Sequence, residues 1–316
     1  MRAIFNVLLL TSTVLSAADW SSLYDTASLE KQGPRLRHDV DLVIAQEIQP
    51  FLTVEQAHAF SQIQLELPLT APPEPNPFDC YSPGEGRLIL PLLTVAFVED
   101  MAEAYSWLWA NRYSSRTVDE YLGMLRNRSP GDFPGNRYPS PLVALHIPAD
   151  ARRDPAVAKM TERVRGTTLS FMLLHQFGHS RYRTAAEESA LRHEGMDGDE
   201  ERADAFALEV MKKNSETPAG LLMLIHGMMY LPAVAPKNHP LSNGRLREMA
   251  NFLDTNIREF SDGRPNRQLT STAIRSLASH IRQSAAFLSD TAGQELWAEQ
   301  SRKTTIADLA PRHFAE

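Results

Sequence analysis

The sequence predicts an α+β protein that is mostly helical, with a small sheet packed on a buried helix. Apolar residues recur at helical spacing over nearly the whole chain from Pro155 onward. Only two apolar runs, residues 87–91 and 142–148, have the length and the closing proline of a short strand. Because strands are so few, we expect helices to form most of the core.

Local signals predict the individual elements. A stretch rich in proline, asparagine and glycine at residues 67–86 indicates a loop or linker. Thr167 or Thr168 can cap a helix that runs to about Tyr182, and Asp199 can cap the next helix. Further helices are expected at residues 40–48, 93–109, 218–230, 242–260 and 270–289. The expected segments are a signal peptide (1–18), a helical segment with the linker (19–75), the main domain (76–262) and a C-terminal helical extension (263–316).

The first 18 residues are typical of a bacterial secretory signal peptide. Arg2 supplies positive charge, residues 4–15 form an apolar run, and residues 16–18 are small, as a signal peptidase requires. The run is too short to span a bilayer comfortably, although an uncleaved anchor stays an alternative. We therefore expect cleavage after Ala18 and a periplasmic or secreted protein without an integral membrane anchor.

Composition excludes two other classes. The net charge is −7, and it becomes −8 when the signal peptide and its one arginine are removed, which argues against nucleic acid as the partner. Cys80 is the only cysteine, so no internal disulfide can form. With an export signal, this favours a bacterial periplasm over a disulfide-rich secreted protein. We expect Cys80 to be a buried small side chain.

Two histidines are the first indication of a metal site. His175 and His179 are four residues apart on a predicted helix, so their Cβ atoms lie about 5–6 Å apart on one face. Two imidazoles at this spacing can share one zinc ion. The helix is apolar on nearly all sides from residue 169 to 177, so it should be buried, where histidines without partners are costly. The pair alone is a weak signal, because the chain has ten histidines.

Two carboxylates further along the chain strengthen this interpretation. Glu200 and Asp204 are also four residues apart, in a segment whose opposite side is apolar. Glu200 can complete a set of two histidines and one carboxylate, which leaves the fourth zinc position open for water or substrate. Asp204 can accept a hydrogen bond from the free ring nitrogen of a ligating histidine. The alternative is a surface carboxylate stabilised by the helix dipole, which we expect for Glu201.

These motifs resemble those of the gluzincin zinc metallopeptidases. The runs His-Gln-Phe-Gly-His at 175–179 and Glu-x-x-Ala-Asp-x-Phe-Ala at 200–207 are most similar to the group of CAAX prenyl proteases and membrane heat-shock proteases, and to a bacterial family of uncharacterised metallopeptidases. The stretch at 239–245 is similar to the His-Pro-x-x-x-x-Arg motif of the prenyl proteases.

The resemblance implies a zincin-like metallopeptidase domain at residues 76–262. It implies a zinc site whose ligands and neighbours come from three motifs. The ligands would be His175, His179 and Glu200, with Asp204 beside them and with His239 and Arg245 approaching the metal from a later helix.

One residue departs from the family motif His-Glu-x-x-His, because this chain has Gln176 in place of the glutamate. That glutamate takes a proton from the attacking water and passes it to the leaving amine. Such acid–base assistance is typically worth about 10²–10⁴-fold in rate. A glutamine amide has a similar size and can hydrogen-bond the same water, but it cannot accept the proton near neutral pH. We expect zinc binding with impaired or absent hydrolysis.

Several explanations of Gln176 stay open. The chain can be a naturally weakened peptidase, or an active one in which Glu187, Glu188 or Glu201 is the base. A third explanation is an inactivating substitution made on purpose. A fourth is a helical protein that binds no metal and matches the motifs by accident. The predicted function is an exported zinc metallopeptidase-like protein that acts on a peptide or protein. The alternative is a non-catalytic periplasmic protein that binds peptides or cell-wall fragments.

Other polar and sulfur-containing residues are expected to have ordinary structural roles. His146 should lie in the strand at 142–148, His193 should be exposed, and His226 should belong to the core, as should the methionines at 223, 228 and 229. Tyr182 or Tyr230 can serve as an oxyanion donor.

Overall fold

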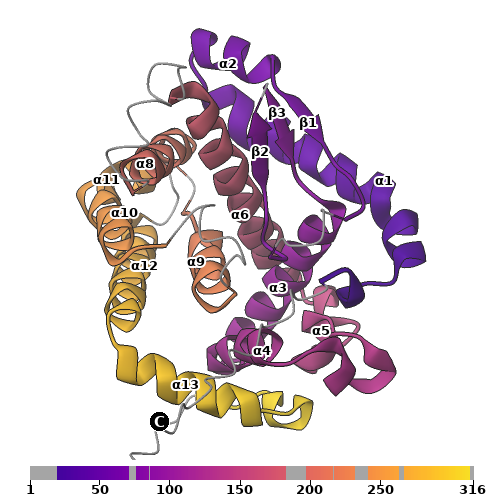
Figure 1. Ribbon diagram of the computed structural model, residues 1–316. Helices are drawn as coiled ribbons and strands as arrows, with labels where there is room; N and C mark the ends of the chain where they lie inside the picture. The colour runs from indigo at the N-terminus through magenta and orange to yellow at the C-terminus, as the bar shows by residue number, and fades with distance from the viewer. Residues whose placement is uncertain are drawn as a thin grey trace, which may run out of the picture.

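The computed structural model describes residues 20–70, 76–84, 86–182, 197–215, 217–231, 241–262 and 267–313. Within them the chain is mostly helical with one three-stranded sheet, which confirms the predicted mostly helical α+β class at that level. Figure 1 shows the sheet, α1 and α2 on one side of α6, and α8 to α12 on the other. The helices are α1 (Thr26–Val43), α2 (Val54–Ser61), α3 (Leu92–Ala110), α4 (Arg116–Asn127), α5 (Pro141–Ala144), α6 (Pro155–Tyr182), α8 (Asp197–Lys213), α9 (Gly220–Tyr230), α10 (Asn243–Thr255), α11 (Ile257–Ser261), α12 (Arg267–Leu288) and α13 (Thr291–Lys303).

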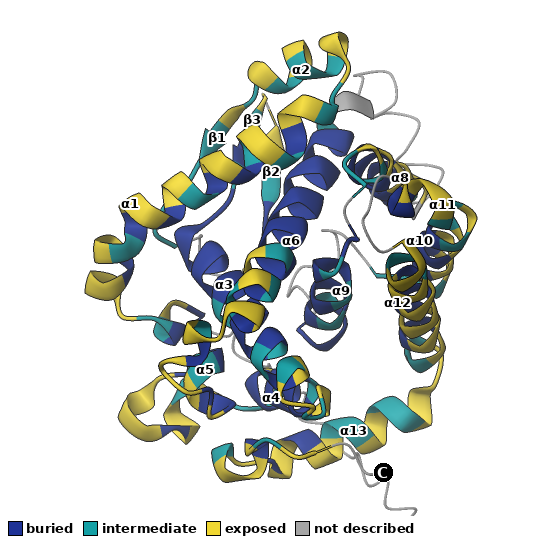
Figure 2. Cartoon of the chain, turned by 180° about the vertical axis from the view of Figure 1, so that it is seen from behind, coloured by how far each residue is buried: buried dark blue, intermediate teal, exposed yellow. Residues whose placement is uncertain are grey.

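Helix α6 forms the centre of the core. Every residue from 164 to 179 is buried, and Figure 2 shows α6 in dark blue along this part of its length. Helices α3, α8 and α9 pack around it. Gly178 permits the close approach of α8, because a Cβ at this position would lie only 3.0 Å from the Cα of Ala203. The end of α6 therefore lies directly against the beginning of α8.

The predicted caps of these two helices are wrong. Helix α6 begins at Pro155, so Thr167 and Thr168 lie inside it. Their hydroxyls donate to the carbonyl oxygens of residues 163 and 164 at 2.8 and 2.7 Å, as threonine does inside a helix, whereas a capping hydroxyl accepts a bond from a backbone N–H. Proline is the better signal for a helix start, because the backbone N–H that it lacks would have no acceptor in the first turn of a helix. Helix α8 begins at Asp197, so Asp199 lies in its first turn and is not its cap.

Residues 142–148 do not form the predicted strand. Pro141 starts the short helix α5 instead, and His146 has a φ of 54°, which ends any extended conformation. Leu145 and Ile147 are nevertheless buried. The apolar run thus reflects burial in the core, which short strands and short helices share.

The sheet is small and lies beside α6. Its strands are β1 (Gln64–Glu66), β2 (Tyr81–Gly84) and β3 (Arg87–Ile89), in the order β1-β3-β2. Strand β3 is parallel to β1 and antiparallel to β2, and it confirms the strand predicted at 87–91. Strand β2 lies within the stretch predicted as a loop, so that prediction is wrong at residues 81–84. Cys80, directly before β2, is buried as expected.

The later helices follow the prediction closely, with one break. Helices α3, α9 and α12 lie within a few residues of the predicted ranges. The helix predicted at 242–260 is divided into α10 and α11 at Asn256, whose side chain donates to the carbonyl of Phe252 at 2.8 Å and satisfies the end of α10. The pattern at residues 40–48 belongs to α1 and a π-helical turn, η2 (Ile44–Ile48).

Within the described chain, no helix combines the length and the hydropathy that crossing a bilayer requires.

Candidate metal centre

Two histidine rings meet at the buried end of α6. His175 and His179 are 5% and 1% exposed. Their rings are perpendicular, with centroids 4.6 Å apart, and their Nε2 atoms lie 3.0 Å apart. The spacing of four residues on one helix produces this arrangement, as the sequence predicts.

Glu200, in the first turns of α8, faces both rings. Its Oε1 lies 3.1 Å from the Nε2 of His179, and its Oε2 lies 3.3 Å from the Nε2 of His175. The ligand atoms of the three residues all lie within 4.8 Å of one another. The fold therefore brings the three predicted ligands into one buried group that could hold a metal ion.

The other ring nitrogen of each histidine, Nδ1, lies close to an aspartate of α8. The Nδ1 of His175 lies 2.8 Å from Asp204, and the Nδ1 of His179 lies 3.0 Å from Asp199. A carboxylate at this distance favours the tautomer whose proton is on Nδ1. Both Nε2 atoms then present lone pairs toward the same point, where the carboxylate of Glu200 also points.

Arg245, from α10, brings a positive charge to the centre. Its guanidinium donates to Asp204 at 2.5 and 2.8 Å and lies 2.9 Å from Glu200. Burial raises the pKa of Asp204, but the charge and hydrogen bonds of Arg245 and the bond to His175 outweigh it, so this pKa is lowered overall. Asp204 is therefore an anion in the core.

The donor set fits a divalent cation. Around a tetrahedral zinc ion, N and O ligands at 2.0–2.2 Å are about 3.3 Å from one another, and the three donors here are separated by 3.0 to 3.3 Å. Among the described residues, the guanidinium of Arg245 pairs with Glu200 and Asp204, and Arg202 lies at the edge, 4.0 Å from Asp199.

The pKa of His175 reflects the same surroundings. Burial lowers it, whereas the hydrogen bonds to Asp204 and Glu200 raise it, and the net shift is upward. The site thus attracts positive charge, in agreement with the geometry of its donors.

Gln176 lies in the same turn of α6 as the ligands. It is 3% exposed, and its backbone carbonyl accepts a hydrogen bond from Ser180 at 3.2 Å. Among the alternative bases, Glu201 is half-buried beside the centre on α8. Glu187 and Glu188 lie outside the described residues.

The other predicted residues divide into two sets. Arg245 reaches the centre as the resemblance implies, whereas His239 lies outside the described residues, as do His193 and the side chain of Tyr182. Tyr230 belongs to an aromatic cluster, where it stacks on Trp297 at 4.4 Å.

Two further histidines have roles outside the centre. His226 is not a simple core residue, because its Nδ1 lies 2.9 Å from Asp119 and 3.2 Å from the hydroxyl of Tyr105. His146 is exposed and lies in no strand; its Nε2 is 3.0 Å from the carbonyl of Ile306. The methionine cluster is packing, as expected, with Met223 and Met229 buried and Met228 partly buried.

Asp199 is the member of the centre that the sequence does not reveal. Its position before Glu200 at the start of a helical pattern is equally typical of a helix cap. Only the direction in which α8 crosses α6 decides that it contacts His179. One signal in the sequence is that two aspartates, Asp199 and Asp204, flank Glu200. Each can accept a hydrogen bond from one of the two histidines.

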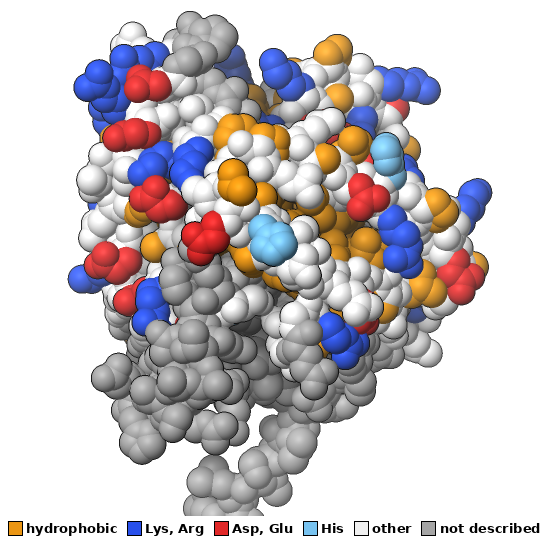
Figure 3. Space-filling view, turned by 90° about the horizontal axis from the view of Figure 1, so that it is seen from above, with side chains coloured by type: hydrophobic (Ala, Val, Ile, Leu, Met, Phe, Trp, Pro, Cys, Tyr) orange, Lys and Arg blue, Asp and Glu red, His pale blue; other side chains and the backbone are white. Residues whose placement is uncertain are grey.

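Figure 3, the view from above, shows acidic and basic side chains interspersed on the described part of this face, with hydrophobic side chains gathered near its middle. This agrees with the modest net charge of the chain.

Comparison of the chain with protein-family models, with curated proteins and with solved structures finds no match.

Proposed function

We propose that this protein is an exported zinc-binding protein of the gluzincin metallopeptidase type, with a zincin-like domain and impaired hydrolysis. One observation carries the proposal: the Nε2 atoms of His175 and His179 and the carboxylate of Glu200 converge at 3.0 to 3.3 Å in the core. Two nitrogen donors and one carboxylate are typical of catalytic zinc sites, which keep a further position open.

The roles of the residues follow from their contacts. His175, His179 and Glu200 would hold the zinc, which as a Lewis acid would polarise a peptide carbonyl and acidify water. Asp204 and Asp199 orient the two imidazoles. Arg245 fixes Glu200 and Asp204, and its charge and hydrogen bonds help to lower the pKa of Asp204.

Gln176 limits the chemistry. An amide at the position of the general base can orient water or a substrate carbonyl, but it cannot carry a proton from water to the leaving amine. The same site therefore also suits a second function, in which a peptide or cell-wall fragment is held without being cut. The buried Gln176 is the observation that favours it.

The signal-like sequence of residues 1–18 supports export of the protein to the periplasm or out of the cell. The peptide or protein partner would therefore be an exported one.

Metal analysis and one substitution test the proposal. We expect the purified mature protein to contain about one zinc ion per chain, and His179→Ala to lose it. We expect Gln176→Glu to gain peptide hydrolysis by about 10²–10⁴-fold over the natural protein. A folded protein that binds no zinc would refute the metal site. Zinc binding without any gain in Gln176→Glu would leave the site standing and favour the binding function.

A further inference from the structure

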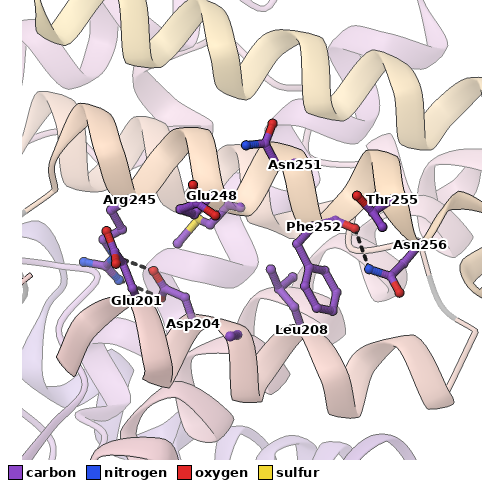
Figure 4. A pocket seen from close by; sticks show the side chains of 11 residues that line it. Glu201, Asp204, Leu208, Arg245, Glu248, Asn251, Phe252, Thr255 and Asn256 are labelled. Carbon is purple, nitrogen blue, oxygen red and sulfur yellow. Dashed lines mark hydrogen bonds and ion pairs between the residues drawn. The ribbon is translucent and has the colours of Figure 1, made fainter. Parts of the chain in front are cut away.

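A cavity lies beside the metal centre, in the groove between α8 and α10. Its volume is about 370 Å³, within the range of about 300–1,000 Å³ that is usual for small-ligand sites. Figure 4 shows Glu201, Asp204 and Leu208 of α8 facing Arg245, Glu248 and Phe252 of α10 across it. Asp204 and Arg245 form its inner wall, so the groove and the metal centre share two side chains.

The groove is amphipathic. Its floor is apolar, because Leu208 and Met249 are buried and the ring of Phe252 is partly exposed beside them. Its rim is polar, with Glu201 on one side and the exposed Glu248 on the other. A ligand that fits this lining needs a long apolar stem and a polar head.

The negative charge of the rim indicates that the polar head of the ligand is a cation. The guanidinium of Arg245 is already matched by Asp204 and Glu200. Among the described residues, no basic side chain forms an ion pair with Glu201 or Glu248. Two carboxylates at the mouth of a cavity attract a cation, and the low dielectric of the walls strengthens the attraction.

At one end of this groove, a lysine of the chain already places its cationic group against the groove residues. The Nζ of Lys212 lies 5.3 Å from the centroid of the Phe252 ring and donates to the Oδ1 of Asn256 at 3.0 Å. A cation over an aromatic face, with its methylene stem on apolar surface, is a favourable arrangement. The face of the groove therefore accommodates a cationic side chain.

We propose that the groove between α8 and α10 binds the side chain of an arginine from a peptide or protein. The stem of this arginine lies on Leu208, Met249 and Phe252, and its guanidinium pairs with Glu201 and Glu248. This site is separate from the metal ligands and does not depend on the proposed peptidase chemistry.

Binding of two fluorescently labelled peptides to the protein as purified tests the proposal. The peptides are identical except that one has arginine where the other has citrulline, which has nearly the same shape without the charge. By fluorescence anisotropy we expect the arginine peptide to bind at least about fivefold more tightly at low salt, and the difference to shrink as salt is added.

Two variants locate the site. In Glu201→Gln/Glu248→Gln the preference for arginine should disappear. It should remain in the double variant Glu30→Gln/Glu295→Gln, which changes the net charge equally at exposed positions elsewhere. Equal binding of the two peptides by the unaltered protein, or a preference that the groove variant retains, would overturn the proposal.

A third variant tests the cavity with both carboxylates in place. Ala205 is exposed and lines the groove, so Ala205→Arg puts a tethered cation where the ligand should lie. We expect it to reduce binding of the arginine peptide by at least about fivefold, whereas Ala27→Arg, at an exposed position of α1, should not. The same affinity in both variants would contradict the assignment.

Discussion

Arg245 donates to both carboxylate oxygens of Asp204, at 2.5 and 2.8 Å, and so ties α10 to α8 in the core. The two side chains are 2% and 4% exposed. A buried ion pair of this kind is costly to break from one side, because the remaining charge has no solvent to stabilise it.

Replacing Arg245 with methionine should therefore destabilise the protein. We expect Arg245→Met to lower the free energy of unfolding by about 3–5 kcal/mol, since Asp204 and Glu200 lose their shared cation. Urea denaturation measures the change. Arg247→Met is the control, because Arg247 is exposed on the same helix and should cost little. A similar loss in both variants would show that the ion pair is not the cause.

Removing the charge behind His179 should weaken metal binding. Asp199 lies 3.0 Å from its Nδ1, and such carboxylates typically contribute about 10–100-fold to metal affinity. We expect Asp199→Asn to bind zinc more weakly by that factor in competition with a chromophoric chelator. Asp41→Asn, on the exposed side of α1, should leave the affinity unchanged. An unchanged affinity in Asp199→Asn would exclude a supporting role for this residue.

A partly buried carboxyl of α3, Asp100, predicts how stability depends on pH. Burial raises the pKa of Asp100 from 3.8 to about 7, although the hydrogen bond from Tyr24 opposes the shift. The folded state then binds this proton more tightly than the unfolded state, so its contribution to stability is complete below about pH 4 and is lost as the pH rises through 7.

Asp100→Asn should remove this dependence. Relative to the variant, we expect the natural protein to lose roughly 4 kcal/mol or less of unfolding free energy between pH 4 and 8. Denaturation at a series of pH values, with a chelator present throughout, gives the comparison. Parallel curves for the two proteins would mean that Asp100 is ionised in the folded state at neutral pH.

Much of the centre could be predicted from the sequence because its information is local. His175 and His179 lie one turn apart on one helix, as do Glu200 and Asp204, and such spacing survives any packing of the two helices. The helix that carries the histidines was also predictable as buried, since it is apolar on nearly all sides.

What the sequence does not predict is decided by packing between elements. Asp199 has the sequence context of a cap, and its contact with His179 depends on the crossing of α6 and α8. The groove at Glu248 likewise exists only because α10 packs beside α8 at a distance that local sequence does not encode. The strand prediction at residues 142–148 is wrong for a related reason. An apolar run indicates burial, but it does not specify whether the buried segment is a strand or a helix.

The distance between α6 and α8 gives a last prediction, which concerns the glycine next to His179. A Cβ on Gly178 would lie 3.0 Å from the Cα of Ala203 and 3.3 Å from its Cβ, atoms that cannot rotate away. Gly178→Ala should push the two helices apart and cost about 1–3 kcal/mol of stability. Because Glu200 lies 3.1 Å from the Nε2 of His179 across the same interface, zinc affinity should fall as well.

Gly198→Ala is the matched control for this substitution. A Cβ on Gly198 meets nothing within 4 Å, so in helix α8 alanine should be neutral or slightly stabilising there. Thermal denaturation with and without zinc separates the two effects, since tighter zinc binding raises the unfolding temperature more. We expect a smaller zinc-induced rise in Gly178→Ala than in Gly198→Ala. Equal rises would mean that the approach of α8 to α6 serves packing and does not set the geometry of the metal centre.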